Sequence, residues 1–319
     1  MGIRNSKVKE QNSEENNADQ EDILLHQQVE EYNIDQEDIL QQVQVLPNKF
    51  KEMILLTRKD PSMLDNIRHY LKENPEMINS KDKDGWSVLM MACRNSNTVS
   101  NIETVQLLLD SGANVNLQNN NGSSALTLSC RYSNTESNIE TVKLLLEYGA
   151  NPNLQNNNGF SALMLSSKHS NTDSNIETVK LLLKHGANVN SQVNNNGSSS
   201  LMFACKYSNT ESNIETVKLL LEYGANLNLQ NNCGNTAIMF ACAYSITDSN
   251  YETVEFLLNK KPNIPTNLFE GMFEMNEFDP RVINLLVNNN VWSSNKNSQQ
   301  RIIAIQNASQ IIARPELEV

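Results

Sequence analysis

The sequence repeats itself with a period of 37 residues over most of its length. Five segments align on a leading glycine, with successive spacings of 37, 37, 38 and 37 residues: Gly85, Gly122, Gly159, Gly197 and Gly234. A unit this short cannot bury an apolar face alone, so each unit must stack on its neighbours. The period therefore predicts an elongated array of repeated units, in which each unit contacts only the next.

The start of each unit predicts a short first helix. In the unit 122–158, Ser124 precedes an apolar segment and is placed to cap a helix that ends near Tyr132. One position near the end of this helix is small in every unit, and we expect it to fill the core. Its occupants are Cys93, Cys130, Ser167, Cys205 and Cys242. Stacked thiols could instead hold a metal, but no CxxC or Cys/His spacing accompanies them, so we expect no metal or cofactor.

The second half of each unit predicts a longer helix with one apolar face. Ser137 and Glu140 have the spacing of a capping box, in which the serine caps the helix. The apolar residues after them follow helical spacing, and Gly149 predicts a left-handed C-cap. The same box recurs in the other units, at Ser100/Glu103, Ser174/Glu177, Ser212/Glu215 and Ser249/Glu252.

These segments resemble a known repeat. Residues 144–153, LLLEYGANPN, resemble the second helix and outgoing loop of the ankyrin repeat, and residues 122–127, GSSALT, are similar to its Gly-x-Thr-Pro-Leu-His opening. The proline and histidine of that opening are absent from all five units, and each unit is about four residues longer than usual. The resemblance implies an all-α solenoid of stacked antiparallel helix pairs with extended loops. The asparagine-rich units are similar to ankyrin proteins of large amoeba-infecting DNA viruses.

The period and the composition together predict the organisation of the chain. The expected segments are an acidic, disordered arm 1–46, an N-terminal capping repeat 47–84, central repeats 85–121, 122–158, 159–196, 197–233 and 234–265, a degenerate C-terminal cap 266–293, and a tail 294–319 that could pack as a helix.

The resemblance implies where a partner would bind. Ankyrin proteins usually bind partners on a concave face made by the loop tips and the exposed side of the first helix. The two residues after the small core position would lie there in each unit, and two aromatic residues lie near the loop tips. We expect this stripe to bind an acidic or phosphorylated segment of a partner protein. Its candidate residues are Trp86, Arg94, Arg131, Tyr132, Phe160, Lys168, His169, Lys206, Tyr207 and Tyr244.

A stripe of this kind also has an ordinary explanation. Duplication copies every residue of a unit, so a stripe can arise without any binding role. Acidic residues in the loop between the two helices could neutralise it locally, and the asparagine-rich loop tips are the alternative docking surface. These acidic residues are Glu136, Asp173, Glu211 and Asp248.

The first residues carry a separate signal. Gly2 and Ser6 fit the pattern for N-myristoylation, and acylation at Gly2 would permit peripheral membrane contact. Residues 1–46 hold 11 acidic and 3 basic side chains, which would oppose binding to an anionic surface. Within this arm the motif DQEDIL occurs at 19–24 and again at 35–40, as a docking motif or as a solvated stretch.

An adaptor role is the alternative function. Leu46 and Pro47, followed by Phe50, Ile54 and Leu55, faintly resemble the start of an F-box, which would deliver a bound partner to a ubiquitin ligase. The same residues also suit the first helix of the capping repeat.

Composition and motifs exclude several classes of protein. The net charge is −12 without a basic patch, which argues against nucleic acid as a partner. The sequence lacks a phosphate-binding glycine loop, an HExxH motif and a nucleophile elbow, so we expect no enzymatic activity. It also lacks an apolar stretch of membrane-spanning length and a secretory leader. We therefore expect a monomeric, cytoplasmic interaction scaffold.

Overall fold

The computed structural model describes residues 46–244, 251–264 and 280–289. The chain divides into two compact units, residues 1–48 and 49–319, and the repeats lie in the second. The expectations for Gly2, the DQEDIL motifs, Asp248 and the tail 294–319 concern residues outside the described ranges.

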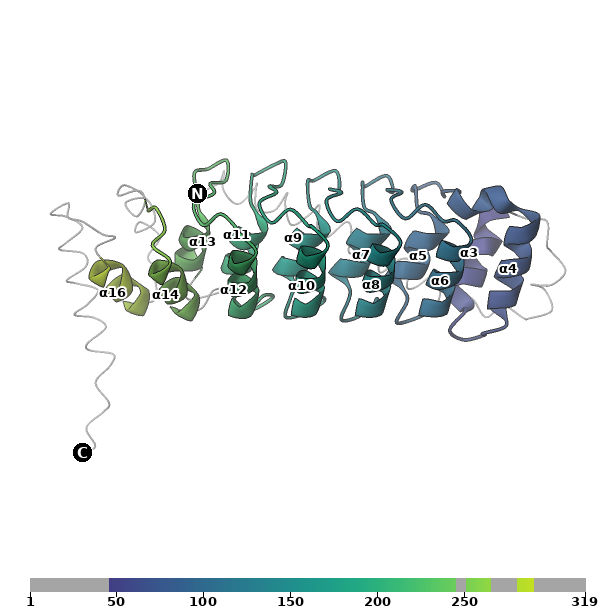
Figure 1. Ribbon diagram of the computed structural model, residues 1–319, viewed down its shortest axis with the longest axis horizontal. Helices are drawn as coiled ribbons and strands as arrows, with labels where there is room; N and C mark the ends of the chain where they lie inside the picture. Colours follow the sequence, from purple (N-terminus) through teal and green to yellow (C-terminus); the bar gives the residue numbers. More distant parts are fainter. Residues whose placement is uncertain (1–45, 245–250, 265–279, 290–319) are drawn as a thin grey trace, which may run out of the picture. The chain divides into compact units, whose positions relative to one another are not determined.

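The described residues form helix pairs in series and contain no β-strand, which confirms the expected all-α solenoid (Figure 1). Two helices and a 3-10 helix precede the repeats: α3 (Leu46–Leu56), α4 (Met63–Glu73) and η1 (Pro75–Asn79). The first helices of the five central units are α5 (Val88–Arg94), α7 (Ala125–Arg131), α9 (Ala162–Lys168), α11 (Ser200–Lys206) and α13 (Ala237–Ala243). The second helices are α6 (Ile102–Asp110), α8 (Ile139–Glu147), α10 (Ile176–Lys184), α12 (Ile214–Glu222) and α14 (Tyr251–Asn259), and α16 (Pro280–Asn288) follows.

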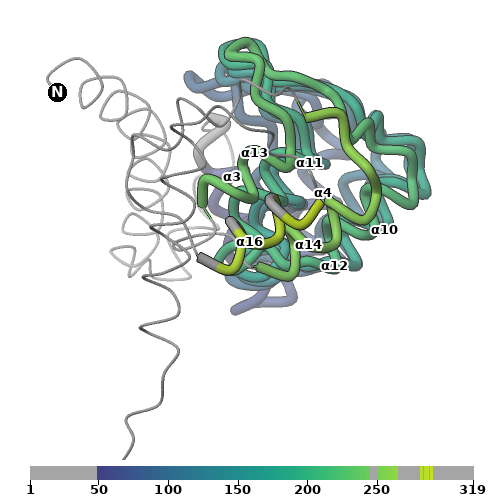
Figure 2. Tube along the Cα trace, turned by 90° about the vertical axis from the view of Figure 1, so that its left-hand side faces the viewer, coloured from purple at the N-terminus to yellow at the C-terminus, as the bar shows by residue number. Residues whose placement is uncertain are grey.

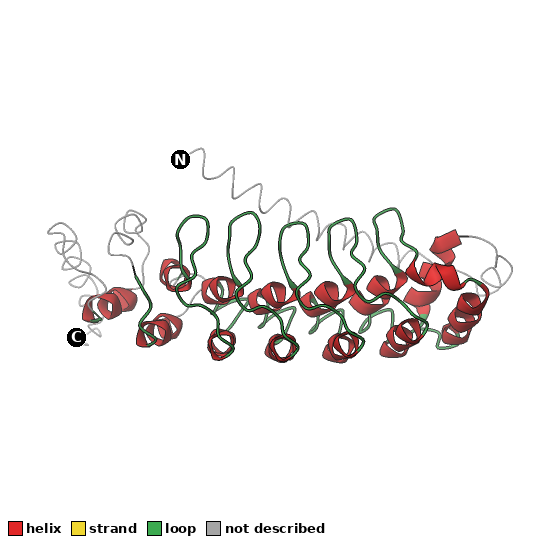
Figure 3. Ribbon diagram, turned by 45° about the horizontal axis from the view of Figure 1, so that its top comes forward, coloured by secondary structure: helices red, strands yellow, loops and turns green. Residues whose placement is uncertain are grey.

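First and second helices form two parallel rows. Each first helix packs against the first helix of the next unit and against its own second helix, and each second helix packs against the next one. Viewed along the stack, successive units nearly superimpose (Figure 2). The loops that connect one unit to the next project beside the first helices as a series of hairpin-like fingers (Figure 3). One face of the array is therefore made by the first helices and the fingers.

The core lies between the two rows of helices. In α8, Val142 and Leu145 are fully buried, because they point toward the first helices and toward the neighbouring second helices. The four cysteines at the small position of the first helices have no exposed surface, and neither has Ser167, so the expected core role is confirmed. Burial raises the pKa of these thiols, to about 12 for Cys242, so they remain protonated at neutral pH.

The caps of the two helices differ from each other. Ser124 caps α7 as expected, because its side chain accepts a hydrogen bond from the backbone N–H of Thr127. The predicted serine cap of the second helix is wrong. Asn138 is the N-cap of α8, where its Oδ1 accepts from the backbone N of Thr141 at 2.8 Å. Asparagine is at least as good a cap as serine, and this choice releases Ser137 for another contact.

The released serines belong to a ladder of buried hydroxyl groups between units. Ser137 lies 3.3 Å from Ser96 of the preceding unit, measured between the two Oγ atoms. One unit further, Ser133 Oγ lies 3.1 Å from Ser174 Oγ and 2.8 Å from Thr178 Oγ1. The serines come from the inter-helix loop, the part that makes each unit longer than the usual ankyrin repeat, whereas Thr178 lies in the first turn of α10. The added residues therefore make contacts between units.

A second set of ladders runs through the fingers. Gln118 Nε2 donates to the backbone O of Gln155 in the next unit at 2.9 Å, and Gln155 does the same to Gln192 at 3.2 Å. The Nδ2 atom of Asn157 donates to the backbone O of Asn120 at 2.8 Å. Each side-chain amide supplies both a donor and an acceptor, so these residues satisfy the backbone groups of adjacent fingers. The abundance of asparagine and glutamine thus has a structural cause.

Candidate functional site

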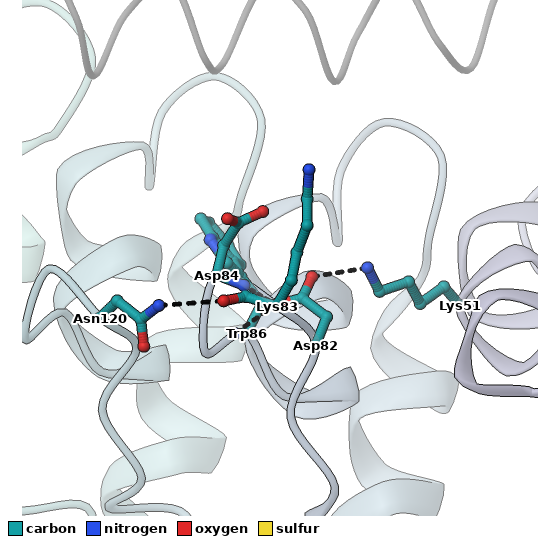
Figure 4. Close-up of polar contacts among 6 residues, drawn as sticks. All are labelled: Lys51, Asp82, Lys83, Asp84, Trp86 and Asn120. Atoms are coloured by element: carbon teal, nitrogen blue, oxygen red, sulfur yellow. Dashed lines mark hydrogen bonds and ion pairs between the residues drawn. The ribbon is translucent and has the colours of Figure 1, made fainter.

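The first finger differs from the others because it is charged. Asp82 Oδ1 accepts from the backbone N of Trp86 at 2.8 Å, and Asp82 Oδ2 pairs with Lys51 Nζ at 2.5 Å (Figure 4). Asn120 of the next finger donates to the backbone O of Lys83 at 3.1 Å. The Trp86 ring is half-buried and packs against the core. The structure therefore gives Trp86 a packing role at the base of this finger.

Three rows of side chains follow the first helices along the stack, and together they form what we call the first-helix surface. The apolar row contains Met91, Leu128, Leu165, Phe203 and Phe240. The basic row contains Arg94, Arg131, Lys168 and Lys206, with Ala243 at the last place. The aromatic row contains Tyr132, Tyr207 and Tyr244, with Asn95 and His169 at the other places.

The expected exposure of the stripe is wrong at three of its residues. Arg94 is only 1% exposed, and Tyr132 and Lys168 are 8% exposed. Arg94 is buried because its guanidinium lies over the Tyr132 ring, 5.0 Å from the centroid, and pairs with Glu136 Oε2 at 2.9 Å. Long basic side chains can cover apolar surface with their stems, and here they fill the space between adjacent units.

In the α11 unit, Lys206 and Tyr207 occupy the places of Arg94 and Asn95 and are half-buried. Lys206 Nζ lies 4.6 Å from the centroid of the Tyr207 ring and 4.8 Å from that of the Tyr244 ring of the next unit. Lys168 Nζ also lies over the Tyr207 ring, at 5.3 Å. The basic and aromatic rows therefore interleave, and the rings of Tyr132 and Tyr207 are each shared by cations of two units. Cations over aromatic rings are attracted by the ring quadrupole, more strongly as the site loses water.

Loop acids partly neutralise the basic row, as the alternative interpretation expected. Besides the pair between Arg94 and Glu136, His169 Nδ1 lies 3.1 Å from Glu211 Oε2. The pKa of the Glu211 carboxyl is lowered, chiefly by the hydrogen bond from His169, while partial burial opposes this effect and the nearby positive charges of Lys168 and Lys206 add to it. Glu211 is thus charged at neutral pH and fixes His169 in the aromatic row.

The apolar row was not predicted from the sequence. Phe203 precedes Lys206 by three residues and Tyr207 by four, so helical spacing places all three on one face. This i, i+3, i+4 pattern was readable in each unit. Phe203 and Phe240 are half-buried, and the Phe203 ring lies 5.4 Å from that of Phe160, the aromatic residue beside the third finger. The structure therefore brings Phe160 together with the first-helix surface.

The described residues show no constellation that suggests catalysis or metal binding. Within residues 46–244, 251–264 and 280–289, no group of three or more His, Cys, Asp or Glu side chains could hold a metal ion. His185, the residue that follows α10, is exposed, and its Nδ1 lies 2.9 Å from the backbone O of Leu181. On the first-helix surface, Arg94 and His169 instead pair with loop glutamates, and Lys206 lies over a tyrosine ring.

Comparison with known families decides what the repeat is. Overlapping matches to a model described as ankyrin repeats (3 copies) cover residues 59–156, 99–193, 134–231 and 174–268, which together make up about two thirds of the chain. The chain belongs to the ankyrin-repeat family. Ankyrin repeats are generally protein–protein interaction modules, and the family is typically made of non-enzymatic scaffolds.

Relatives among curated proteins match over short stretches. Ankyrin repeat protein L122 of Acanthamoeba polyphaga mimivirus is 38% identical over 63 residues, which is 20% of this chain and 10% of that protein. Ankyrin repeat protein L289 of the same virus is 46% identical over 48 residues, 15% of this chain and 9% of its own. The matched segments therefore span about a tenth of each relative. These matches confirm the likeness to ankyrin proteins of a large amoeba-infecting virus.

The helices of the ankyrin array are short. None of those in the described ranges has the length and the apolar character needed to cross a bilayer.

Proposed function

We propose that this ankyrin protein is a non-enzymatic scaffold that binds an acidic or phosphorylated segment of a partner protein on its first-helix surface, the concave face of the family. The observation that carries the proposal is the interleaving of the basic and aromatic rows, with Lys206 between the rings of Tyr207 and Tyr244. Tyrosine and basic side chains held in this way supply rigid contact area and positive charge together.

The outer face of the array has a different character. The second helices carry Lys143, Lys180 and Lys218, and each lies within 4.0 Å of a glutamate one turn away on the same helix. Such exposed pairs are locally balanced and contribute little to recognition. The fingers, the alternative docking surface, use many of their amide side chains to bridge neighbouring fingers. The balanced charges of the outer face and the bridged amides of the fingers therefore both favour the first-helix surface as the docking surface.

The adaptor alternative gains no support from the described residues. Phe50 and Ile54, which carry the resemblance to an F-box, are buried in the core, and the Phe50 ring lies 4.8 Å from that of Tyr70. They therefore act as part of the first capping helix, α3. Gly2 lies outside the described residues, and acylation remains a prediction from its motif.

The test compares two charge reversals in the full chain. One variant carries Arg131→Glu, Lys168→Glu and Lys206→Glu, and the matched control carries Lys143→Glu, Lys180→Glu and Lys218→Glu on the outer face. Both variants change the net charge equally. Affinity capture from an Acanthamoeba lysate, chosen because both relatives come from Acanthamoeba polyphaga mimivirus, should retain a partner with the wild type and the control and lose it with the first variant.

A second first-helix variant guards against a folding defect. Lys168 is buried, so its reversal could destabilise the array; Arg131→Gln with Lys206→Gln removes charge without burying a carboxylate. Thermal unfolding of all variants should be compared before capture. A partner retained equally by every variant would contradict binding at this surface, and so would a partner lost only from the control.

A further inference from the structure

The first-helix surface changes character from one end of the stack to the other. At its N-terminal end, Met91, Arg94 and Asn95 are all buried. At the equivalent places of α11, Phe203, Lys206 and Tyr207 are half-buried. Side chains that are half-buried retain surface for a partner, whereas buried ones contribute only through the packing of the units. The first unit therefore offers little contact area for a partner, whereas the later units offer more.

That end holds a connected set of aromatic rings. Phe160 lies 5.4 Å from Phe203, and Phe240 lies 6.4 Å from Tyr244, between ring centroids. Lys206 connects the two units, because its Nζ atom lies within 4.8 Å of the centroids of both Tyr207 and Tyr244. We call these six residues the aromatic cluster.

Duplication alone does not produce this cluster. The second helices α8 and α12 have the identical sequence IETVKLLLE, whereas their first helices read ALTLSCR and SLMFACK. The apolar row thus changes from Leu128 and Leu165 to Phe203 and Phe240 along the stack. The larger rings lie on the half-buried side of the helix, and although Phe240 also touches the core, leucine fills the equivalent place at Leu128. Aromatic rings in such positions are typical of binding anchors.

The charges of the cluster favour carboxylates over phosphate. Arginine, with its planar fork, is the residue that matches phosphate in two-point contacts, whereas lysine acts as a point charge. The two arginines of the basic row are Arg94 and Arg131, at the N-terminal end, and Arg94 pairs with Glu136. Lys206 lies between the rings of Tyr207 and Tyr244, so the positive charge within the cluster comes from a lysine. The proposed partner segment therefore carries aspartate or glutamate next to a bulky apolar side chain.

We infer that the aromatic cluster takes the apolar anchor of a carboxylate-rich partner segment, with the anchor against the rings of Phe203 and Phe240 and the carboxylates toward Lys206. This inference rests on the proposed function and names the partner chemistry of the same surface. It makes the C-terminal units, and not the whole stripe, the determinant of specificity.

The experiment measures binding of defined peptides to the full chain by fluorescence anisotropy. Four labelled 12-residue peptides are the probes: an acidic peptide with leucine and phenylalanine anchors, the same peptide with serine at the anchors, a version with phosphoserine in place of the acidic residues, and a version with lysine in their place. We expect the first peptide to bind best, the serine version to bind about tenfold more weakly, and the lysine version not to bind.

The decisive variant is Phe203→Leu with Phe240→Leu. It gives α11 and α13 the leucine that α7 and α9 carry at this position, so the array should fold as before. We expect about tenfold weaker binding of the first peptide, because two rings are lost. The matched control is Tyr148→Leu with Tyr223→Leu at the ends of α8 and α12, where both rings are 40% exposed and outside the cluster. This control should bind like the wild type.

Each alternative outcome overturns the inference in a distinguishable way. Equal binding of the leucine variant would exclude the cluster, while loss of the captured partner on charge reversal would leave the proposed function standing. Tighter binding of the phosphoserine peptide would assign the surface to a phosphorylated partner. Self-association that the leucine variant abolishes would assign it to a second copy. Binding that arises only after the acidic residues of 1–46 are neutralised would assign it to this chain's own arm.

Discussion

Residues at one position of the repeat have different environments along the stack, and the basic row shows why. Arg94 is buried between a tyrosine ring and Glu136, whereas Lys206, three units later, is half-buried between two rings. The difference follows from the neighbours in the adjacent unit, since each side chain of this row reaches across to the next first helix. The same position of the repeat therefore makes different contacts in different units.

The pair between His169 and Glu211 makes a prediction about pH. Because the pKa of Glu211 is lowered below its ordinary value of 4.5 in the folded state, its charge stabilises the fold above that pH, and the effect is lost as pH falls through the folded pKa. We expect Glu211→Gln to cost about 0.5 kcal/mol at pH 7, since the carboxylate is half-exposed and screened. The cost should shrink as pH falls below 4.5 and vanish once the pH is below the lowered folded pKa.

Urea unfolding at pH 7, 5 and 3.5 measures this difference. His169→Tyr provides the control, because tyrosine occupies the same place in α7, α11 and α13 units; in that background Glu211→Gln should cost less at pH 7. A cost for Glu211→Gln that is the same at all three pH values would show that the carboxyl contributes by packing and not by its charge.

The environments of such residues were only partly predictable from sequence. The positions of the stripe followed from helical spacing, and the neutralising role of Glu136 and Glu211 was foreseen as an alternative. The burial of Arg94 was not, because it depends on Tyr132 in the next unit, and the apolar row containing Phe203 was overlooked although its spacing was visible. Contacts between units depend on how helices stack, which a single unit does not determine.

Glycines stand both at the ends of the second helices and in the fingers, and the fingers restrict the choice of residue more strictly. Gly122 and Gly149 have nearly the same backbone conformation, with φ of +76° and +81°. They differ in surroundings: a Cβ atom on Gly122 would lie 2.6 Å from Oδ1 and 2.7 Å from the backbone N of Asn157 in the next finger, whereas a Cβ on Gly149 meets nothing within 4 Å. The first glycine is required by close approach as well as by conformation.

This contrast predicts unequal costs for one substitution. Gly149→Ala should destabilise the protein by about 1 kcal/mol, the strain of a positive φ in a residue with a Cβ. Gly122→Ala should cost about 1–2 kcal/mol more, because the neighbouring finger must also move. Urea unfolding of the two variants and the wild type measures both values, with Gly149→Ala as the internal reference. Equal losses would mean that adjacent fingers can separate without cost.

Helix boundaries were more predictable than the contacts of the loops that join them. The left-handed glycines and the serine caps of the first helices followed from local rules that need no tertiary information. The cap of the second helix was assigned to Ser137 instead of Asn138, since both residues are good caps and lie side by side. What separates them is the hydroxyl ladder to Ser96 in the preceding unit, which requires the stack itself.

At the scale of the molecule, the array is a one-dimensional chain of interfaces. Hydroxyl ladders, finger ladders and packing of the second helices all connect a unit to its immediate neighbours. In such an array stability is approximately a sum of unit terms and interface terms, so the consequence of a defect depends on where it lies. A unit between two well-formed neighbours is held on both sides, and a unit near the end is held less.

One substitution made at two equivalent positions tests this account. Leu145 in α8 and Leu257 in α14 are both fully buried and occupy the same place in their helices, so Leu→Ala at either should remove about 2–5 kcal/mol locally. Leu257→Ala should release α13, α14 and the α16 that packs on α14 while α7 to α10 keep their protection, since units near the end can open without breaking the central interfaces. Leu145→Ala should reduce protection on both sides of α8, because opening the central unit breaks two interfaces. Hydrogen exchange followed by mass spectrometry resolves these segments. Uniform loss of protection in both variants would instead show that the ladders couple the whole array into a single cooperative unit.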